Sequence, residues 1–276
     1  MLDKISKVVI IFSLLFATAG AVYAETVTVA GSGGMIPLLT ALGAAYMKKY
    51  PHDEIQCNPN SITQSGGILA AKNGAVDIGM SARGLEVREL SYNIDAYHIA
   101  DVAAVVAVHS NVRVTNITSK QLCAIYSGKI TNWRELGGHD ARIVVFTRPE
   151  NDSTKQVFRS GIPCFSELKE APEAISMFKS NNMLSALQRT PDSIGIIDSI
   201  ALEQSQGKAR TVKLDGRSAS VEEVAAGRWP VTKKYTLVVG EKRKKAVDRF
   251  MRFIKSREGA ALISKHNGIP VNFSYP

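Results

Sequence analysis

The sequence repeatedly places a short apolar strand before a loop of small polar residues and then a helix. The first unit, residues 26–50, reads TVTVAGSGGMIPLLTALGAAYMKKY, with valines alternating with threonines, a glycine turn and then apolar residues at helical spacing. The pattern returns at residues 54–74, 75–90 and 142–158. Alternating strands and helices are typical of α/β folds, which bind ligands at the carboxyl ends of their strands. The recurrence therefore predicts an α/β fold with a ligand site built from loops.

Further strands and helices continue this alternation. Apolar strands are expected in DVAAVVAVH (101–109), SIGIID (193–198) and YTLVVG (235–240). The last expected helix, KKAVDRFMRFIKS (244–256), carries an apolar stripe at spacings of three and four. No internal repeat, low-complexity tract or proline-rich linker interrupts the pattern, so no segment marks a domain boundary by its composition.

The first 24 residues are typical of an export signal. Lys4 and Lys7 precede an apolar run at residues 8–16, and small residues follow up to Ala24. This order predicts a secretory signal peptide, residues 1–24, cleaved after Ala24; the alternative is an uncleaved N-terminal anchor. Later apolar runs are too short to cross a bilayer. We therefore expect a soluble, periplasmic protein.

The formal net charge of +9 favours anionic ligands or partners. The densest basic cluster, EKRKK at residues 241–245, is expected to open a helix as a solvated face. It lacks the interleaved aromatic residues of a nucleic-acid patch. The five histidines are scattered, and no nucleophile–base motif stands out. We expect no enzymatic activity, no cofactor, no bound metal and no nucleic-acid partner.

The three cysteines allow at most one disulfide in an exported chain. They are Cys57, Cys123 and Cys164, and the sequence leaves the pair open. Their spacing does not fit a zinc site. Cys123 lies in the apolar row of SKQLCAIY, which is typical of a small core residue.

The segment TRPENDSTKQVF places an arginine, a carboxylate and two hydroxyls at the expected start of a helix. Ser153 and Gln156 match a capping box, and Asp152 also suits a helix N-terminus. Capping leaves Arg148 and Thr154 unexplained. An arginine binds an oxyanion through two hydrogen bonds, and free N–H groups at a helix N-terminus bind further oxygens. Because comparable loops follow other strands, we favour an oxyanion site.

Longer motifs make the sequence resemble a known family. QSGGI, VDIGMSAR, SKQLCAIYSGKITNWRELGG and RIVVFTRPENDST occur in order, followed by SIGIID, GRWPVTKKYTLVV and EGAALISKHNGIPV. This ordered set resembles the periplasmic phosphate-binding proteins of ABC importers over nearly the whole chain after the signal peptide. The resemblance implies a type II periplasmic binding protein fold, an α/β fold with two lobes that each contain a mixed sheet flanked by helices. It also implies closure on an oxyanion, with phosphate favoured, and delivery to an ABC permease in the inner membrane.

The resemblance also implies how the chain divides and which residues bind the ligand. Residues 25–108 and 231–276 are expected to form lobe I, and residues 109–230 lobe II. Arg148 and Thr154 match the arginine and the turn threonine of the family. The expected ligand-binding residues are Ser32, Gly33, Gly34, Gln64, Ser65, Gly66, Ser81, Arg83, Arg148, Asp152, Ser153 and Thr154.

Several positions depart from the family pattern. Gly33 stands where the family has a threonine, Gln64 where it has a serine, and Asp152 and Ser153 where it has a serine and a glycine. The carboxylate that accepts the ligand's proton in phosphate binders aligns with Ala82. Such a carboxylate admits only an anion that still carries a proton, so it rejects sulfate. We hypothesise that Asp152 supplies this acceptor; the alternative is a helix cap that faces water.

Three further side chains have competing interpretations. Arg83 is either a second cation of the site or a loop arginine held by packing or a salt bridge. Trp133 and Trp229 lie in turn-like segments away from the strand ends, so we expect them to be structural and not to stack on a sugar.

The identity of the anion stays open in the sequence. Molybdate, tungstate, sulfate and a small organic anion are alternatives to phosphate, and the chain is expected to act as a monomer. Other possible functions are a sensor or surface adhesion protein that keeps the binding fold, or an exported hydrolase of phosphate esters. The hydrolase is disfavoured because no motif supplies a nucleophile and a base.

Overall fold

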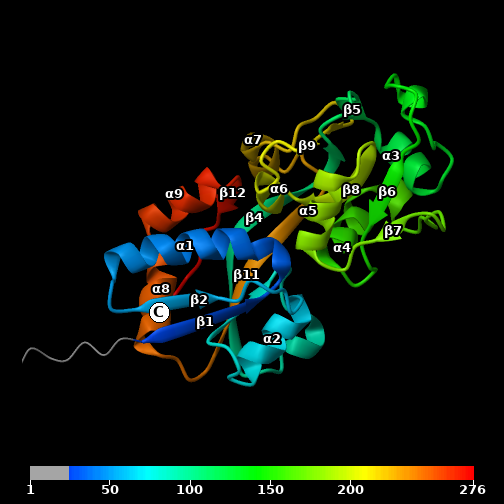
Figure 1. The fold of residues 1–276 in the computed structure, drawn as a ribbon. Helices are drawn as coiled ribbons and strands as arrows, with labels where there is room; N and C mark the ends of the chain where they lie inside the picture. The colour runs from blue at the N-terminus through cyan, green and yellow to red at the C-terminus, as the bar shows by residue number, and fades with distance from the viewer. Residues whose placement is uncertain (1–24) are drawn as a thin grey trace, which may run out of the picture.

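The structure confirms the α/β alternation that the sequence predicts. It is a computed structural model that describes residues 25–276, and the expected signal peptide lies outside the described residues. Two lobes lie side by side, and each contains part of a mixed sheet with helices packed against it (Figure 1). None of the described helices is both long and apolar enough to cross a membrane.

The first lobe is built on three parallel strands. β1 (Thr26–Gly31) pairs with β2 (Glu54–Cys57) on one side and with β3 (Ile78–Ser81) on the other. Val27 and Val29 lie in the core, as their alternation with threonines predicts. The helices of this lobe are η1 (Gly33–Met35), α1 (Ile36–Lys49), α2 (Gln64–Lys72), η2 (Val87–Glu89), α8 (Lys245–Lys255) and α9 (Arg257–Lys265).

The second lobe also contains three parallel strands. β6 (Val144–Thr147) pairs in parallel with β8 (Ser193–Asp198) and with β7 (Ile175–Ser176). A separate two-stranded sheet joins β5 (Asn116–Ile117) to β10 (Lys213–Leu214). The helices of this lobe are α3 (Ser119–Tyr126), η3 (Trp133–Leu136), α4 (Ser153–Gly161), η4 (Pro163–Phe165), α5 (Ser180–Arg189), α6 (Ser199–Glu203) and α7 (Val221–Ala225).

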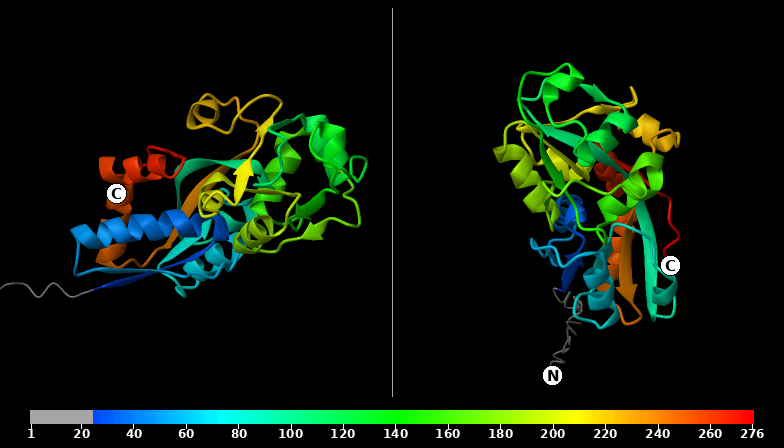
Figure 2. Two further views of the ribbon diagram at one scale, coloured as in Figure 1. Left: turned by 45° about the horizontal axis from the view of Figure 1, so that its top comes forward. Right: turned by 90° about the vertical axis from the view of Figure 1, so that its right-hand side faces the viewer.

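Two long antiparallel strands run from one lobe to the other (Figures 1 and 2). The first part of β4 (Ile94–His109) pairs with β11 (Thr232–Gly240) and β12 (Gly268–Pro270), and its last part pairs with β8 and β9 (Ala209–Thr211). The sheet order is therefore β2-β1-β3-β11-β4-β8-β6-β7.

The buried apolar residues form a main cluster in each lobe, and both clusters include part of β4. Val102 belongs to the cluster of the first lobe, and Ala103 belongs to that of the second. Continuous strands therefore connect the lobes, which explains why no linker composition marks the boundary in the sequence. The lobe limits near residues 108 and 231 remain a proposal.

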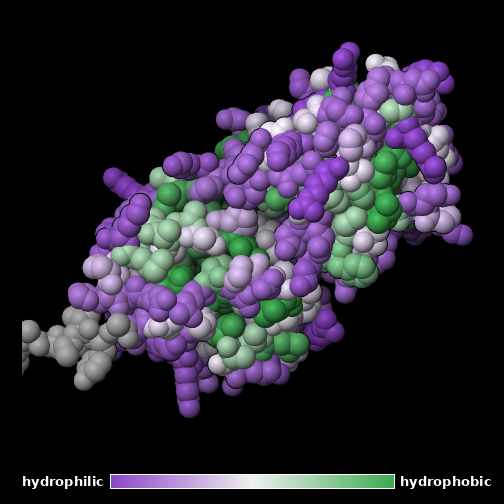
Figure 3. Space-filling model, in the orientation of Figure 1, coloured by the Kyte–Doolittle hydropathy of each residue, from purple (hydrophilic) through white to green (hydrophobic). Residues whose placement is uncertain are grey.

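The basic cluster at residues 241–245 does not form the helix face that the sequence predicts, because α8 begins only at Lys245. Arg243 donates instead to the carbonyl of Gly240 (3.2 Å), and Lys244 pairs with Asp77 (2.9 Å). These contacts tie the turn after β11 to the sheet. On the face shown in Figure 3, hydrophobic residues gather over α1, over α2 and near β6 and β7, between hydrophilic stretches.

Both tryptophans are buried in the second lobe, as expected for structural residues. The indole N–H of Trp133 donates to the carbonyl oxygen of Asp192 (2.9 Å). That of Trp229 donates to the carbonyl oxygen of Ala104 (3.0 Å). Each ring therefore fills a core position with its polar atom satisfied.

A disulfide joins Cys123 in α3 to Cys164 in η4, which answers the pairing that the sequence left open. Cys123 is buried, as expected, but it is a cross-link and not a free core thiol. Cys57 at the end of β2 is the free cysteine of the described chain.

This disulfide should stabilise the second lobe. The bond closes a loop with a sequence separation of 41, for which the loss of chain entropy in the unfolded state predicts about 4 kcal/mol. We expect the Cys123→Ala/Cys164→Ala variant to unfold at a clearly lower temperature, and reduction of the wild type to have the same effect. Thermal unfolding followed by circular dichroism measures both. Cys57→Ala is the matched control; equal midpoints for wild type and double variant would contradict the prediction.

Candidate functional site

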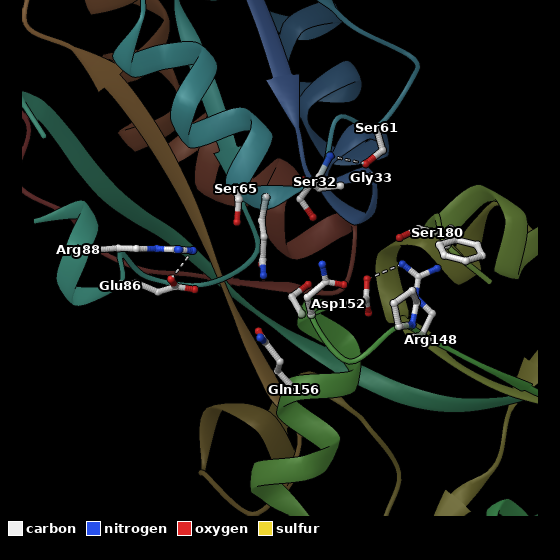
Figure 4. A pocket seen from close by; sticks show the side chains of 16 residues that line it. Ser32, Gly33, Ser61, Ser65, Glu86, Arg88, Arg148, Asp152, Gln156 and Ser180 are labelled. Carbon is white, nitrogen blue, oxygen red and sulfur yellow. Dashed lines mark hydrogen bonds and ion pairs between the residues drawn. The ribbon is translucent and has the colours of Figure 1, made fainter. Parts of the chain in front are cut away.

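A cavity of about 220 Å³ lies between the two lobes (Figure 4). Hydroxyl and amide side chains from loops after β1 and β2 form one wall, and the loop between β6 and α4 forms much of the other. The lining residues are Ser32, Gly33, Ser61, Thr63, Gln64, Ser65, Glu86, Arg88, Arg148, Pro149, Asn151, Asp152, Ser153, Gln156, Phe178 and Ser180.

Arg148 is the buried cation of this cavity. It follows the last residue of β6 and is only 5 % exposed. Its Nη2 donates to Oδ2 of Asp152 (2.5 Å), whereas its Nε and Nη1 are buried and have no hydrogen-bond partner within the described chain. Buried guanidinium donors without partners are costly, and an oxyanion is the ligand that satisfies several of them at once. The geometry therefore favours an anion beside Arg148.

Asp152 caps helix α4, so the expected capping box of Ser153 and Gln156 is wrong. Its Oδ1 accepts from the backbone N–H groups of Thr154 (2.9 Å) and Lys155 (3.3 Å). The cap lies one residue earlier than expected, because Asp152 and not Ser153 has the extended backbone of an N-cap. Asp152 also lines the cavity, so its carboxylate does not face open water only.

The carboxylate of Asp152 is held in its ionised form. Burial raises the pKa of Asp152, but the hydrogen bond and charge of Arg148, together with the charge of Lys233, lower it more. The resulting pKa lies below its usual range. An ionised carboxylate accepts hydrogen bonds and donates none.

Helix α2 brings its N-terminus to the opposite wall of the cavity. Thr63 caps this helix, with its side chain accepting from the N–H of Gly66 (3.2 Å). The next two residues, Gln64 and Ser65, line the cavity, and Oε1 of Gln64 is buried without a partner in the described chain. The N-terminus of a helix favours negative charge. Ser32 and Gly33, after β1, complete this wall.

Seven of the twelve residues expected at the site line the cavity. They are Ser32, Gly33, Gln64, Ser65, Arg148, Asp152 and Ser153. Gly34, Gly66, Ser81, Arg83 and Thr154 do not line it. Ser81 is fully buried at the end of β3, and Gly66 lies in the first turn of α2.

Arg83 pairs with carboxylates of its own loop and also donates to the hydroxyl of Ser65 in α2 (3.4 Å). Its Nη1 and Nη2 donate to the two carboxylate oxygens of Glu89 (2.7 and 2.8 Å), and Nη2 also lies 3.1 Å from Glu86. The hydrogen bond from Arg83, which outweighs burial, lowers the pKa of Glu89. A bidentate pair of this kind holds a loop in place. The structure thus matches the interpretation of Arg83 as a loop arginine.

Position 34 requires glycine because Asp198 of the second lobe lies directly against its backbone. A Cβ atom at this position would lie 1.7 Å from Oδ2 of Asp198, so no other residue fits without movement. The carbonyl oxygen of Gly34 accepts from the hydroxyl of Tyr235 (2.8 Å). The glycine turn therefore serves two purposes: Gly33 lines the cavity, and Gly34 admits a buried carboxylate behind it.

A buried ion pair connects the lobes at this point. Nζ of Lys233, on the crossing strand β11, lies 2.6 Å from Oδ1 of Asp198 and donates to Oγ1 of Thr154 (3.1 Å). The contact between Lys233 and Asp198 is an ion pair, and neither carboxylate oxygen of Asp198 has a hydrogen-bond partner within the described chain. Burial and the neighbouring carboxylate of Asp198 raise the pKa of Tyr235 well above its usual value.

Nine lining residues were not among the expected set. They are Ser61, Thr63, Glu86, Arg88, Pro149, Asn151, Gln156, Phe178 and Ser180. Most of them lie within a few residues of an expected residue in the same loop, so including whole loops in the prediction would have found them. Phe178, which is 73 % exposed, and Ser180, which begins α5, give no such signal because they come from a separate part of the chain.

The cavity does not resemble a metal site. Within residues 25–276, no group of three or more histidine, cysteine, aspartate or glutamate side chains is placed to hold a metal ion. The charged residues of the lining are Glu86, Arg88, Arg148 and Asp152.

The chain is similar to known solute-binding proteins in sequence and in fold. The family model described as PBP superfamily domain matches residues 17–258. A structure described as a phosphate ABC transporter substrate-binding protein from Clostridium perfringens, with bound phosphate, is 31 % identical, covers 89 % of this chain and 99 % of its own, and has a TM-score of 0.78. The phosphate-binding protein PstS of Bacillus subtilis is 28 % identical over 89 % of this chain and 81 % of its own. A phosphate transport receptor from Vibrio cholerae, 22 % identical, has the same fold with a TM-score of 0.64 over 88 % of this chain and 99 % of its own.

The ion pair behind the cavity should be important for stability. Lys233 and Asp198 are almost fully buried, so Lys233→Met leaves an uncompensated carboxylate at a cost of about 3–5 kcal/mol. We expect Asp198→Asn in the same chain to recover most of that loss, because it removes the stranded charge. Urea unfolding of wild type, single and double variants measures the coupling. A single variant as stable as wild type, or a double variant no better than the single, would contradict this role.

Proposed function

The chain belongs to the PBP superfamily, and on that premise we propose that it is an exported solute-binding protein that captures an oxyanion, with phosphate favoured, between its lobes. The loaded protein delivers the anion to an ABC permease in the membrane. Relatives named as phosphate-binding proteins, and a similar structure that holds phosphate, support the ligand class. The match to a family of binding proteins also favours a binding protein over an enzyme.

The observation that carries this proposal is the buried guanidinium of Arg148 with two unpartnered nitrogens at an interlobe cavity. The anion binds these donors from the second lobe. Ser32, Gly33, Gln64 and Ser65 contribute hydroxyl, amide and backbone groups from the first lobe. Because one ligand contacts both walls, binding favours closure of the lobes about β4 and β11.

The remaining candidates support the walls of the site. Gly34 makes room for Asp198, Gly66 lies in the capped first turn of α2, and Arg83 fixes the loop after β3. Thr154 accepts a hydrogen bond from Lys233, which ties the start of α4 to β11. Ser81 is buried beside these loops.

Loss of Arg148 should abolish tight anion binding. Removing one partner of a buried, hydrogen-bonded charge pair costs about 2–5 kcal/mol, so we expect the dissociation constant for phosphate to rise at least about thirtyfold in Arg148→Ala. Isothermal titration calorimetry of purified protein, freed of carried-over phosphate, measures this. Arg134→Ala is the matched control, because Arg134 is 70 % exposed and pairs with Asp140. Unchanged affinity in Arg148→Ala would remove this arginine from the site.

The choice between phosphate and sulfate should depend on Asp152. Its ionised carboxylate repels sulfate, which has no proton to donate, and accepts a hydrogen bond from the P–OH group of hydrogen phosphate. Asp152→Asn keeps a capping oxygen but loses the charge, so we expect the ratio of phosphate to sulfate affinity to fall at least about tenfold, on the scale of one lost charged hydrogen bond. Any disturbance of Arg148 in this variant weakens the binding of both anions, so it cancels in the ratio of the two affinities. An unchanged ratio, measured by competition titration, would mean that Asp152 acts only as a cap.

A further inference from the structure

The anion cavity has room for more than one small ion. Its volume is about 220 Å³. A water molecule takes up about 30 Å³ in the liquid, so this space corresponds to about seven waters. The four oxygens of phosphate all lie around one phosphorus atom. An ion that contacts Arg148 therefore leaves a large part of the cavity unfilled.

Further closure of the lobes is limited, because they already touch beside the cavity. A Cβ atom on Gly33 of the first lobe would lie 3.6 Å from Cβ of Ser180 in the second. The carboxylate of Asp198, also in the second lobe, lies directly against the backbone of Gly34. The space that an ion at Arg148 leaves unfilled is therefore part of the site itself.

This unfilled part differs in character from the end at Arg148. Figure 4 shows Glu86 and Arg88 on the side of the cavity opposite Arg148. Arg148 is buried, whereas the side chains of Glu86 and Arg88 are 42 % and 71 % exposed and form an ion pair (2.9 Å). The side chain of Gln156, from α4, points into the same cavity. The outer end thus presents a carboxylate, a guanidinium and an amide, and its two charges cancel.

An uncharged polar group fits this outer end better than a second anion. A further anionic group would face the carboxylates of Glu86 and Asp152, which repel it. A hydroxyl group can donate to Glu86 and accept from Arg88 or from the amide of Gln156. The pair between Glu86 and Arg88 is exposed, and exposed pairs contribute little to stability, so it rearranges at small cost.

Asp152 also favours a substituent that carries a hydroxyl group. Its ionised carboxylate accepts hydrogen bonds and has none to donate. Hydrogen phosphate offers a P–OH group, but a phosphate monoester loses its last P–OH proton with a pKa of about 6. Above that pH, a monoester offers Asp152 a hydrogen-bond donor only if its substituent carries one.

We propose, resting on the proposed function, that the site also binds phosphate monoesters with a small hydroxylated substituent. The phosphoryl oxygens lie beside Arg148, and the substituent extends past Asp152 toward Glu86 and Arg88. Inorganic phosphate uses the same contacts at Arg148 and leaves the outer end to water. A monoester of equal charge with an apolar substituent satisfies neither Asp152 nor Glu86.

Calorimetric titration at pH 8 with phosphate, propyl phosphate and glycerol 1-phosphate tests the inference. The two esters have the same carbon chain length and the same charge, but propyl phosphate lacks the hydroxyl groups. We expect glycerol 1-phosphate to bind at least about tenfold more tightly than propyl phosphate, on the scale of one hydrogen bond to a charged group. If phosphate binds and glycerol 1-phosphate gains nothing over propyl phosphate, this inference fails and the proposed function stands. If none of these anions binds, the proposed function itself fails.

A variant at the outer end separates the substituent from the phosphoryl group. Gln156 is exposed and uncharged, so Gln156→Leu removes an amide without changing the charge near Arg148. We expect the ratio of glycerol 1-phosphate affinity to propyl phosphate affinity to fall at least about threefold, on the scale of one neutral hydrogen bond, and phosphate affinity to be unchanged. Gln56→Leu is the matched control, because Gln56 is exposed on β2 and does not line the cavity. An affinity ratio in Gln156→Leu equal to that of wild type would overturn the placement of the substituent.

Discussion

A buried guanidinium with free nitrogens is the interaction on which the rest of this molecule depends. Arg148 is removed from water, yet Asp152 satisfies only one of its nitrogens. Such an arrangement is unfavourable unless an anion is bound, because buried donors lose their bonds to water. The fold fixes the arginine in one position, so little side-chain entropy is lost when a ligand binds.

The fixed position comes from a polar network behind the loop. Lys155 is fully buried in the first turn of α4, where its Nζ donates to Oγ1 of Thr147 (2.6 Å) and pairs with Glu170. Thr147 also donates to Glu170 (2.9 Å) and directly precedes Arg148. Burial lowers the pKa of Lys155 despite the opposing effect of Glu170. Strand end, loop and helix start are thereby held together, and Lys233 adds a link to the other lobe through Thr154.

Much of this site follows from local sequence, and the rest does not. Strand ends followed by glycine, serine or arginine correctly predict that Ser32, Gly33, Ser65 and Arg148 come together around one cavity, because period and turn chemistry are local properties. The same pattern also predicts Ser81 and Arg83 there, and these do not line the cavity. Other features depend on contacts that no local pattern contains. The carboxylate of Asp198 reaches Gly34 from the second lobe, Phe178 comes from a segment without a motif, and the partner of Cys123 depends on how α3 packs against η4.

The charged side chains of the cavity balance one another. Two cations, Arg148 and Arg88, are matched by two carboxylates, Asp152 and Glu86, so the lining has no formal surplus of charge. In the function proposed above, an anion is held by oriented donors, namely the guanidinium nitrogens of Arg148 and the N-terminus of α2, and not by net attraction. Oriented donors and acceptors respond to where a ligand carries its protons and substituents. Asp152, one of the carboxylates that cancel the charge, is thus also the group proposed to discriminate among anions of similar size.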